Sequence, residues 1–285
     1  MKIAGVVVLY NPDEDIINNI LSYYNNLELL YIVDNSSFAK EELIAKLISF
    51  DKISYFKKED NIGIAAALNF AAEKAIKARF DWLLTMDQDS KFSSNGLPYM
   101  KNFIKVNDTE KIALITPFHK IRSRKAPKSS ENEYVLHAMT SGNLVNLDIF
   151  QIIGGFNEKL FIDSVDHDYC LKANSKGYKI LRMNSVILNH NLGNISIELN
   201  ILGKKIITTN HNYIRRYYIY RNSFYIIKTY GRKFPQIVIL FVRIRILELI
   251  KIIFFEDNKF KKIKYILKAI IDFKNNNFYK INKKD

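Results

Sequence analysis

Short apolar runs alternate with amphipathic segments along the first hundred residues. A continuous apolar run is typical of a strand that is buried on both faces of a sheet, and four such runs lie at 3–9, 29–33, 53–56 and 82–86. Segments with apolar residues at helical spacing lie between them, at about 12–24, 40–49 and 62–78. Repeated strand–helix units predict an α/β fold in which helices wrap a mostly parallel sheet.

The pattern is mixed in the middle of the chain and helical at its end. We predict a helix at 94–106, a strand at 112–117, a surface loop at 119–133, extended structure at 134–147, a helix at 165–176 and a strand at 178–188. From about residue 209 onward the pattern is helical and rich in Ile, Tyr, Phe, Lys and Arg. The sequence therefore predicts an α/β part followed by a helical C-terminal region.

Composition narrows the class of protein. The 285 residues are 48% hydrophobic and 25% charged, which is typical of a folded chain with a core. The single cysteine, Cys170, excludes a disulfide framework and a thiolate zinc site, because each needs several cysteines. The apolar run at 3–10 lacks the basic flank of a signal peptide. We therefore expect an intracellular protein.

The net charge of +14 comes from the C-terminal region. Residues 1–200 carry 23 Lys and Arg against 24 Asp and Glu, whereas residues 201–285 carry 20 against 5. A neutral body with a basic appendage indicates an anionic partner for the appendage. Membrane phospholipid, nucleic acid and an anionic polymer all fit this charge.

Two carboxylates one residue apart, Asp87 and Asp89, follow the predicted strand at 82–86. Ligands of such sheets bind at the carboxyl ends of strands, and Mg²⁺ binds carboxylate oxygens together with substrate phosphates. The pair indicates a site for a metal-bound diphosphate, although two solvated loop acids explain so short a motif as well. His190, after the strand at 178–188, is either a further metal ligand or a solvated loop histidine.

Asp34 follows the strand at 29–33, while Asn61 and Gly63 adjoin the start of the helix at 62–78. A carboxylate at a strand end can hydrogen-bond a base or a ribose, and the first-turn amides of a helix can face phosphates. Ordinary capping and turn chemistry explains the same residues. The chain has no G-x-G-x-x-G and no G-x-x-x-x-G-K-[ST], which argues against a dinucleotide oxidoreductase and a P-loop kinase.

Three carboxylates, Asp163, Asp166 and Asp168, crowd the start of the helix at 165–176. Acidic residues are favourable at a helix N-terminus, but three of them exceed what a cap needs. One carboxylate held near a hydroxyl in a partly desolvated cleft can abstract a proton. The adjoining His167 also allows a metal phosphohydrolase, for which the other histidines form no obvious ligand set.

Taken in order, these motifs resemble the family-2 glycosyltransferases, and within them the bacterial rhamnosyltransferases. The resemblance covers about residues 3–225. It rests on Val6-Val7-Val8-Leu9-Tyr10-Asn11-Pro12, Val33-Asp34-Asn35-Ser36, Asn61-Ile62-Gly63-Ile64-Ala65-x-Ala67-x-Asn69, Asp81 to Ser90, Ser141-Gly142-Asn143, Gly154 to Glu158, Phe161 to Cys170, Asn189-His190-x-Leu192-Gly193 and Tyr217-Tyr218-x-Tyr220-Arg221-Asn222.

The resemblance implies a glycosyltransferase A-type fold, Rossmann-like with flanking helices. It implies a catalytic domain at 1–208, with a nucleotide-binding half at about 1–110 and an acceptor half at about 111–208. Residues 209–285 would be a basic, aromatic, helical C-terminal region.

The resemblance also implies roles for single residues. Asp34 would bind the pyrimidine base, Asp87 the ribose or the sugar, and Asp89 the metal, with His190 as a further metal ligand. Tyr10, Asn11, Asn61, Gly63, Asn69 and Gln88 complete the implied donor-binding set.

Asp166 aligns with the general base of the family. A Glu often precedes this base in the family, whereas Val165 precedes it here, so that Asp163 is the second candidate.

The implied activity is an inverting, metal-dependent transfer of L-rhamnose from dTDP-L-rhamnose to a cell-surface polysaccharide or a lipid-linked oligosaccharide. Magnesium or manganese would stabilise the charge that grows on the diphosphate leaving group. One alternative is another hexosyltransferase that uses a UDP-sugar. The alternative from a different class is a non-enzymatic, basic adaptor for a membrane or a nucleic acid.

The C-terminal region contains no predicted membrane span, because four charged residues interrupt the apolar run at 237–255. Residues 259–274 place apolar residues near one helical face and lysines mainly elsewhere, which fits an interfacial helix on anionic lipid. An amphipathic helix packed on the catalytic domain, or on a twin subunit in a homo-oligomer, fits as well. Nucleic acid is disfavoured, because no known nucleic-acid module accompanies the charge. We therefore expect a cytoplasmic enzyme at the inner face of the cell membrane.

Overall fold

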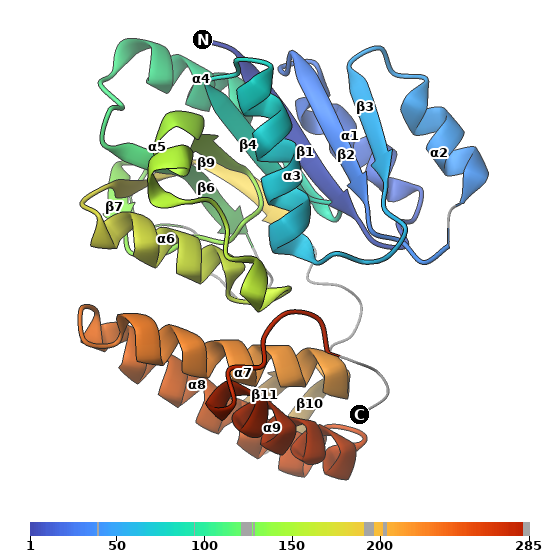
Figure 1. The fold of residues 1–285 in the computed structure, drawn as a ribbon, viewed down its shortest axis with the longest axis vertical. Helices are drawn as coiled ribbons and strands as arrows, with labels where there is room; N and C mark the ends of the chain where they lie inside the picture. Colours follow the sequence, from blue (N-terminus) through green and yellow to red (C-terminus); the bar gives the residue numbers. More distant parts are fainter. Residues whose placement is uncertain are drawn as a thin grey trace. The chain divides into compact units, whose positions relative to one another are not determined.

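The computed structural model describes residues 1–38, 40–93, 95–120, 127, 129–190, 197–201 and 204–281 (Figure 1). The chain forms two compact units. Unit 1 comprises Met1–Glu158 and Val165–Asn191, and unit 2 comprises Lys159–Ser164 and Leu192–Asp285. Unit 2 thus starts before the boundary that we placed at residue 208, and it includes a short segment from the middle of the α/β part. Seven of the fifteen residues of the surface loop predicted at 119–133 lie outside the described residues.

Unit 1 is built on a mixed sheet with the order β3-β2-β1-β4-β8-β6-β9-β5, and β7 pairs with β9. The strands are β1 (Ile3–Leu9), β2 (Leu29–Asp34), β3 (Ile53–Lys57), β4 (Trp82–Asp87), β5 (Ser90–Phe92), β6 (Ile112–Lys120), β7 (Asn132–Val135), β8 (Asn143–Asn146) and β9 (Lys179–His190). Strands β1 to β4 are parallel, as are β6 and β9. Strands β5, β7 and β8 pair antiparallel with their neighbours. The predicted parallel sheet is therefore confirmed for the first half, and the second half is mixed.

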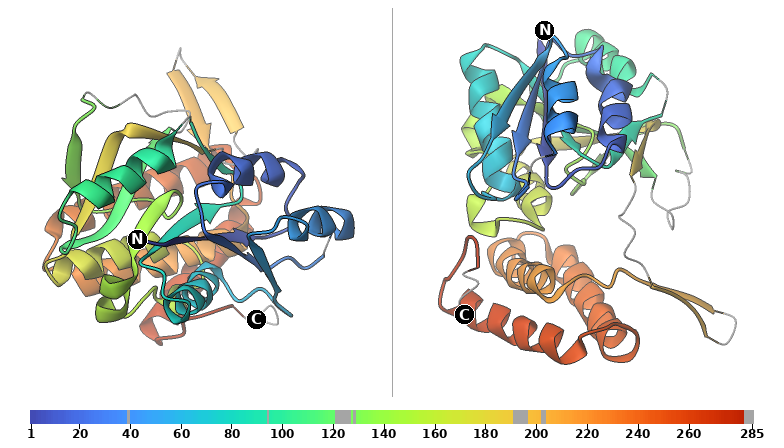
Figure 2. Two further views of the ribbon diagram at one scale, coloured as in Figure 1. Left: turned by 90° about the horizontal axis from the view of Figure 1, so that it is seen from above. Right: turned by 90° about the vertical axis from the view of Figure 1, so that its right-hand side faces the viewer.

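Helices lie on both faces of this sheet (Figure 2). They are α1 (Asp15–Tyr24), α2 (Glu41–Ile48), α3 (Ile64–Lys77), α4 (Gly96–Val106), α5 (Leu147–Ile153) and α6 (Val165–Ser175). Helix α5 was not predicted from the sequence, which indicated extended structure up to residue 147. The side chain of Asn146 caps it by accepting hydrogen bonds from the backbone N–H groups of Asp148 (3.1 Å) and Ile149 (3.2 Å).

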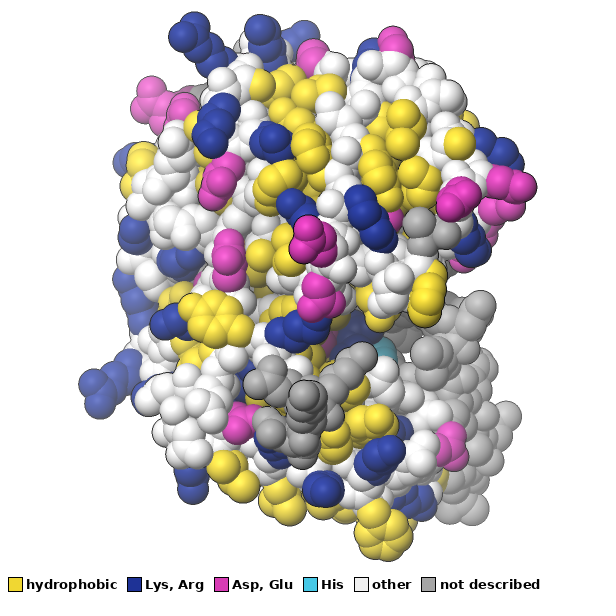
Figure 3. Space-filling model, turned by 45° about the vertical axis from the view of Figure 1, so that its right-hand side comes forward, with side chains coloured by type: hydrophobic (Ala, Val, Ile, Leu, Met, Phe, Trp, Pro, Cys, Tyr) yellow, Lys and Arg dark blue, Asp and Glu magenta, His cyan; other side chains and the backbone are white. Residues whose placement is uncertain are grey.

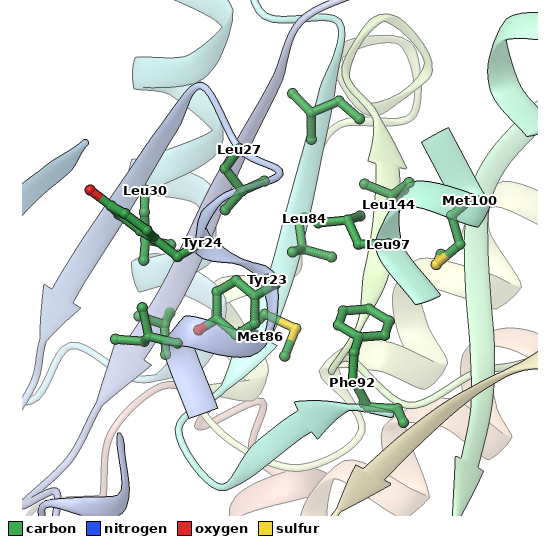
Figure 4. Close-up of a cluster of buried hydrophobic side chains, with 14 of the residues drawn as sticks. Tyr23, Tyr24, Leu27, Leu30, Leu84, Met86, Phe92, Leu97, Met100 and Leu144 are labelled. Atoms are coloured by element: carbon green, nitrogen blue, oxygen red, sulfur yellow. The ribbon is translucent and has the colours of Figure 1, made fainter. Parts of the chain in front are cut away.

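An extensive hydrophobic core lies between the sheet and helices α1, α2 and α4. Because side chains alternate along a strand, β1 directs Ile3, Val7 and Leu9 into this core. Tyr23 of α1 and Met86 of β4 point toward one another within it (Figure 4). The Ala-rich helix α3 packs against β1, β2 and β4, and its small buried side chains allow a close approach. The buried strands thereby hold their carboxyl ends at fixed positions.

Unit 2 contains a hairpin of β10 (Ile197–Ile201) and β11 (Lys204–Thr208), followed by α7 (Tyr213–Tyr230), α8 (Pro235–Phe255) and α9 (Lys259–Lys274). The helical pattern predicted from residue 209 is confirmed, whereas the hairpin was not predicted. Helix α7 packs against both α8 and α9. A core of aromatic residues from α7 closes on one residue of α8 and two of α9, namely Ile252, Ile266 and Ala269. In the described part of the chain, no helix has the length and apolar character needed to cross a membrane.

A buried ionic cluster joins four elements of unit 2. The carboxylate of Glu256, at the end of α8, lies 2.6 Å from the guanidinium of Arg216 on α7 and 2.8 Å from the ammonium of Lys262 on α9. It also accepts a hydrogen bond from the hydroxyl of Thr208, the last residue of β11. Each partner charge is needed, because a lone buried charge is strongly destabilising.

Candidate active site

The sheet brings three acidic and polar strand ends to one edge. In the parallel register, Leu9 of β1 lies opposite Asp34 of β2, and Val8 of β1 lies opposite Asp87 of β4. The two carboxylate residues therefore flank the end of β1 from either side. This edge is where open α/β sheets bind ligands, outside the carboxyl ends of their strands.

The carboxylate of Asp34 is buried and held by neighbours from β3. It accepts hydrogen bonds from the backbone N–H of Ser36 (2.8 Å), the hydroxyl of Tyr55 (2.5 Å) and the ammonium of Lys57 (3.3 Å). Burial acts to raise the pKa of Asp34, but these hydrogen bonds and the charge of Lys57 outweigh it and lower the pKa. Asp34 is therefore an ionised anchor that fixes Tyr55 and Lys57 at this edge.

Gln88 ties the loops after β1 and β4 together. Its side-chain oxygen accepts from the backbone N–H of Tyr10 (2.8 Å), and its side-chain nitrogen donates to the carbonyl of Tyr10 (3.3 Å). Asn11 in turn donates its backbone N–H to the hydroxyl of Ser36 (2.7 Å), after β2. The structure thus brings Tyr10, Asn11 and Gln88 together and gives Gln88 the role of a clamp between loops.

The loop 139–143 supports the end of β4. The backbone N–H of Asp87 donates to the hydroxyl of Ser141 (3.0 Å), and the N–H of Gly142 donates to the carbonyl of Thr85 (2.7 Å). Gly142 has a φ of +77°, a left-handed conformation that glycine adopts at low cost. These bonds fix the backbone on which Asp87 and Asp89 stand.

Asp89 and His190 occupy neighbouring backbone positions. Strand β5 begins directly after Asp89, and its first residue, Ser90, lies opposite His190 in the antiparallel register with β9. The side chain of His190 is outside the described residues, among which no group of three metal-binding side chains is found. A carboxylate with one further ligand still suits a hard cation, because Mg²⁺ keeps waters and takes substrate phosphates as ligands.

The start of α3 and its middle have separate tasks. The side-chain oxygen of Asn61 accepts from the N–H of Gly63 (2.9 Å), whose φ of +85° sets the turn into the helix. The carbonyl of Gly63 accepts from the side chain of Asn35 (3.2 Å), so that the helix start is tied to the end of β2. The side chain of Asn69 instead bonds both the N–H and the carbonyl of Phe156, each at 2.9 Å. Asn69 therefore holds the segment that follows α5. Asn69 itself lies about two helical turns along the chain from the Asn61 turn.

Asp166 stands in the first turn of α6 beside two histidines. Its carboxylate lies 2.9 Å from Nδ1 of His167, and the ring of His137 stacks on the ring of His167 with 4.9 Å between centroids. Burial acts to raise the pKa of Asp166, but His167 and, more weakly, His137 outweigh it and lower the pKa. The carboxylate is thus ionised at neutral pH, which is the state a general base needs.

Asp163, the second candidate base, has a different environment. It belongs to unit 2, and its carboxylate lies 3.3 Å from the guanidinium of Arg215 on α7. The partner of Asp163 is thus a guanidinium, whereas the partner of Asp166 is an imidazole. The two candidate bases differ in this contact.

The segment Lys159–Ser164 is fastened to α7 by one amide side chain. The side-chain nitrogen of Asn222 donates to the carbonyls of Leu160 (2.9 Å), Ile162 (2.8 Å) and Asp163 (2.8 Å). The neighbouring Arg221 donates to the carbonyls of Lys159, Leu160 and Tyr279. These bonds stabilise an unusual backbone, because Phe161, Asp163 and Ser164 all have left-handed φ angles of 62–64°.

Several contributing residues were not foreseen from the sequence. Tyr55 lies on the strand predicted at 53–56 and Lys57 directly follows it, and neither was predicted to contact Asp34. His137 meets His167 across 30 residues of chain, and no local pattern announces such a contact. Asn222 was part of the family resemblance, but its three carbonyl partners could be found only in the structure.

Comparison with known proteins identifies the class. Residues 6–169 match the family model described as Glycosyl transferase family 2. The chain belongs to this family and is a glycosyltransferase. Over 288 aligned positions it is 25% identical to the dTDP-rhamnosyl transferase RfbF of Shigella flexneri, covering 95% of this chain and 93% of that protein.

Two solved structures show the fold. S. aureus TarS in complex with UDP-GlcNAc has a TM-score of 0.58 at 15% identity, covering 96% of this chain and 80% of that chain. GalNAc-T7 with UDP, GalNAc and Mn²⁺ has a TM-score of 0.55 at 14% identity, covering 67% of this chain. The present chain spans only 44% of the GalNAc-T7 chain. The likeness confirms the predicted glycosyltransferase A-type fold.

Proposed function

We propose that this enzyme transfers L-rhamnose from dTDP-L-rhamnose to a hydroxyl of a polysaccharide or a lipid-linked oligosaccharide, with inversion at the anomeric carbon. The observation that carries the proposal is the likeness to RfbF, which extends over 95% of this chain and includes both units. A likeness confined to the sheet would support membership of the family but would not indicate which sugar is transferred. The two blocks at 84–90 and 163–171, which resemble rhamnosyltransferases, lie within this range.

The donor would bind at the shared edge of β1, β2 and β4. The pyrimidine base of the donor would lie near the end of β2, where Asp34 fixes Tyr55 and Lys57. Asp87 would contact the ribose or the sugar. The Asn61–Gly63 turn would present the first amides of α3 to the phosphates, because helix N-termini favour anions.

Asp89 and His190 would hold a divalent cation, magnesium or manganese. Their neighbouring backbone positions fit this role. When bound, the cation supplies positive charge against the negative charge of the departing diphosphate. The Gln88 clamp and the loop 139–143 keep the backbone around Asp89 in place.

Asp166 would act as the general base. Its ionised carboxylate would take the proton of the acceptor hydroxyl while the oxygen forms a bond to the anomeric carbon. The bond from that carbon to the diphosphate oxygen breaks in the same step, and dTDP leaves with the electron pair. A single displacement of this kind inverts the configuration at the anomeric carbon.

Calorimetric titration with nucleotide sugars tests the donor. In the presence of Mn²⁺, dTDP-L-rhamnose should bind more tightly than UDP-glucose and UDP-GlcNAc, and should raise the unfolding temperature most by mass action. Tighter binding of a UDP-sugar would reject rhamnose as the sugar while leaving the family intact. Absence of binding to every nucleotide sugar would reject the site at this edge.

The variant Asp89→Ala tests the metal site. We expect Mn²⁺-dependent binding of dTDP to fall by roughly tenfold or more, since a carboxylate ligand of a divalent cation is lost. The fold should be retained, because the residue stands in a turn between β4 and β5. Asp108→Ala, in the exposed turn between α4 and β6, is the matched control. Equal dTDP affinity in both variants would remove Asp89 from the metal site.

A further inference from the structure

Helix α8 presents an apolar face that unit 2 does not cover. Side chains at i, i+3 and i+4 spacing line this face and are 41–70% exposed, namely Ile239, Val242, Ile246, Ile250 and Ile253. The opposite face of the helix packs inward through the buried Ile237, Phe241 and Ile252. We call the five exposed residues the α8 stripe. A surface of this kind usually marks a contact with a partner or a membrane.

The α8 stripe is flanked by positive charge alone. Arg243 borders the same shallow, open surface as Ile239, Val242 and Ile246. The acidic residue of this helix, Glu248, is directed inward to Arg216 (3.4 Å) and Arg245 (2.7 Å). Elsewhere on unit 2, Figure 3 shows apolar and cationic side chains side by side, with a few acidic ones between them.

The surrounding segment is strongly basic. Residues 209–281 carry 16 Lys and Arg against four Asp and Glu, a net charge of +12. Three of the four acids are engaged inside unit 2: Glu248 as above, Glu256 in the buried ionic cluster, and Asp272 with the hydroxyl of Tyr217 (2.8 Å). The outward charge of the segment is therefore almost entirely positive.

Helix α9, which the sequence indicated as the interfacial helix, uses only part of its apolar face within the protein, because Phe260, Leu267 and Ile271 are exposed. Ile266 and Ala269 are buried in the core shared with α7. The buried face of α9 thus packs against protein, on helix α7 of the same unit. Among the described side chains of unit 2, the largest set of exposed apolar residues lies on α8.

We infer that the α8 stripe is a docking surface for an anionic phospholipid bilayer, with α8 lying in the plane of the interface. The five apolar side chains would enter the boundary of the acyl chains, while Arg243 and Lys251 reach back to the phosphates. A second copy of this chain is a poorer occupant, because symmetric pairing would place two faces of like charge together. Anionic lipid provides the opposite charge. The inference stands apart from the proposed sugar specificity.

A single introduced thiol reports on this contact. The native cysteine, Cys170, is buried, so Ile246→Cys carries the accessible site for an environment-sensitive fluorophore. We expect a blue shift on addition of phosphatidylglycerol vesicles and none with phosphatidylcholine vesicles. Leu267→Cys, at an exposed apolar position of α9, is the matched position and should shift less. Equal shifts at both positions, or none at Ile246→Cys, would overturn the assignment to α8.

Sedimentation with vesicles measures the energetics. The double variant Ile246→Glu with Ile250→Glu should lower partition onto phosphatidylglycerol vesicles by roughly tenfold per residue, because each loses the burial of an apolar side chain. Ile152→Glu, an exposed position on α5, should partition as the wild type, and far-UV circular dichroism of each variant verifies the fold. Arg243→Gln with Lys251→Gln should weaken binding and reduce its dependence on salt.

Two results would overturn the inference. One is wild-type protein that ignores phosphatidylglycerol vesicles at low salt. The other is a wild-type dimer, measured by light scattering, that the double variant converts to a monomer, since the stripe would then be covered by a second copy.

Discussion

Asp166 and His167 act on one another through a 2.9 Å contact. The imidazole keeps the carboxylate ionised against the effect of burial, and the stacked ring of His137 extends this environment. A base with a lowered pKa binds a proton less strongly, but it is ionised and able to accept one at neutral pH. Two consequences can be measured in single variants.

Replacing Asp166 by Asn should stop transfer and leave donor binding intact. The amide has nearly the same shape but accepts no proton, so turnover should fall by roughly 10²–10⁴-fold. Steady-state kinetics together with calorimetric binding of dTDP separates the two effects. Asp163→Asn is the control and should retain most of the turnover, because that carboxylate pairs with Arg215. The reverse outcome would transfer the role of base to Asp163.

Replacing His167 by Asn should move the acid limit of activity to higher pH. The active form has Asp166 ionised, and its pKa is lowered in the folded protein chiefly by His167. Without the imidazole that pKa rises, so activity is lost at a higher pH as the solution is acidified. The pH profile of kcat measures the shift. His211→Asn, in unit 2, should leave the limit unchanged, and an unchanged limit in His167→Asn would detach the histidine from the base.

The sequence was most informative at residues whose position follows from a strand end. Asp34, Asp87 and Asp89 follow apolar runs that could hardly be anything but buried strands, so their meeting at one edge was predictable. Tyr55 and His137 reach their partners through tertiary contacts, and such contacts leave no periodic trace in the sequence.

At the scale of elements, the segment Lys159–Ser164 is the least ordinary feature. Three of its residues other than glycine have left-handed φ angles, and each such conformation costs of order 1–3 kcal/mol of free energy. An isolated segment would therefore adopt a more favourable backbone conformation. Asn222 offsets this cost because the two N–H groups of its amide are shared among three carbonyls at 2.8–2.9 Å. Helix α6, with Asp166 in its first turn, begins directly after this segment.

Replacing Asn222 by Ala should therefore release the segment. Removing the donors from three carbonyls should destabilise it by about 1–3 kcal/mol, and amide hydrogen exchange at residues 161–164 should accelerate accordingly. Asn275→Ala, at an exposed position after α9, should leave that exchange unchanged. Exchange that is equally slow in Asn222→Ala would show that Arg221 suffices to hold the segment.

The elements that the sequence analysis missed share a physical reason. Helix α5 is only seven residues long, and its start depends on the cap provided by Asn146. The β10–β11 hairpin is short and antiparallel, and its pattern merges with the basic region that follows. By contrast, the buried strands were predictable from continuous apolar runs, and α3 was predictable from apolar residues at helical spacing over a long segment.

At the scale of the whole molecule, the ionic cluster around Glu256 couples stability to pH. Burial acts to raise the pKa of Glu256, but hydrogen bonds from Lys262 and Thr208 and the charge of Arg216 outweigh it and lower the pKa. Because the folded pKa lies below the unfolded value, the cluster stabilises unit 2 above the ordinary pKa of a glutamate. This contribution is lost as the pH falls through the folded pKa.

Glu256→Gln should lower the free energy of unfolding of unit 2 by about 3–5 kcal/mol at neutral pH, because two buried cations lose their counter-charge. It should also flatten the decline of stability in acid. Hydrogen exchange of α7 amides as a function of pH measures both effects, and Glu110→Gln, an exposed residue before β6, is the control. A slope in acid equal to that of the wild type would assign the pH dependence to other groups.

Charge asymmetry alone predicted that the C-terminal region differs from the rest of the chain. It could not predict that six residues from the middle of the chain belong to that region in space. Hydrogen bonds from Asn222 to backbone carbonyls carry no signature in the identity of the residues that accept them.

This exchange of six residues has a consequence for recombination. If unit 2 were continuous in the sequence, a single crossover after β9 could replace its C-terminal helices by those of a homologous enzyme. Such a chimaera would pair a foreign α7 with the native Lys159–Ser164, and the three carbonyls held by Asn222 would meet a helix that had not evolved with them. A functional exchange needs a second crossover that carries residues 159–164 along with the helices. Residues 159–164 and the helices of unit 2 therefore have to be exchanged together.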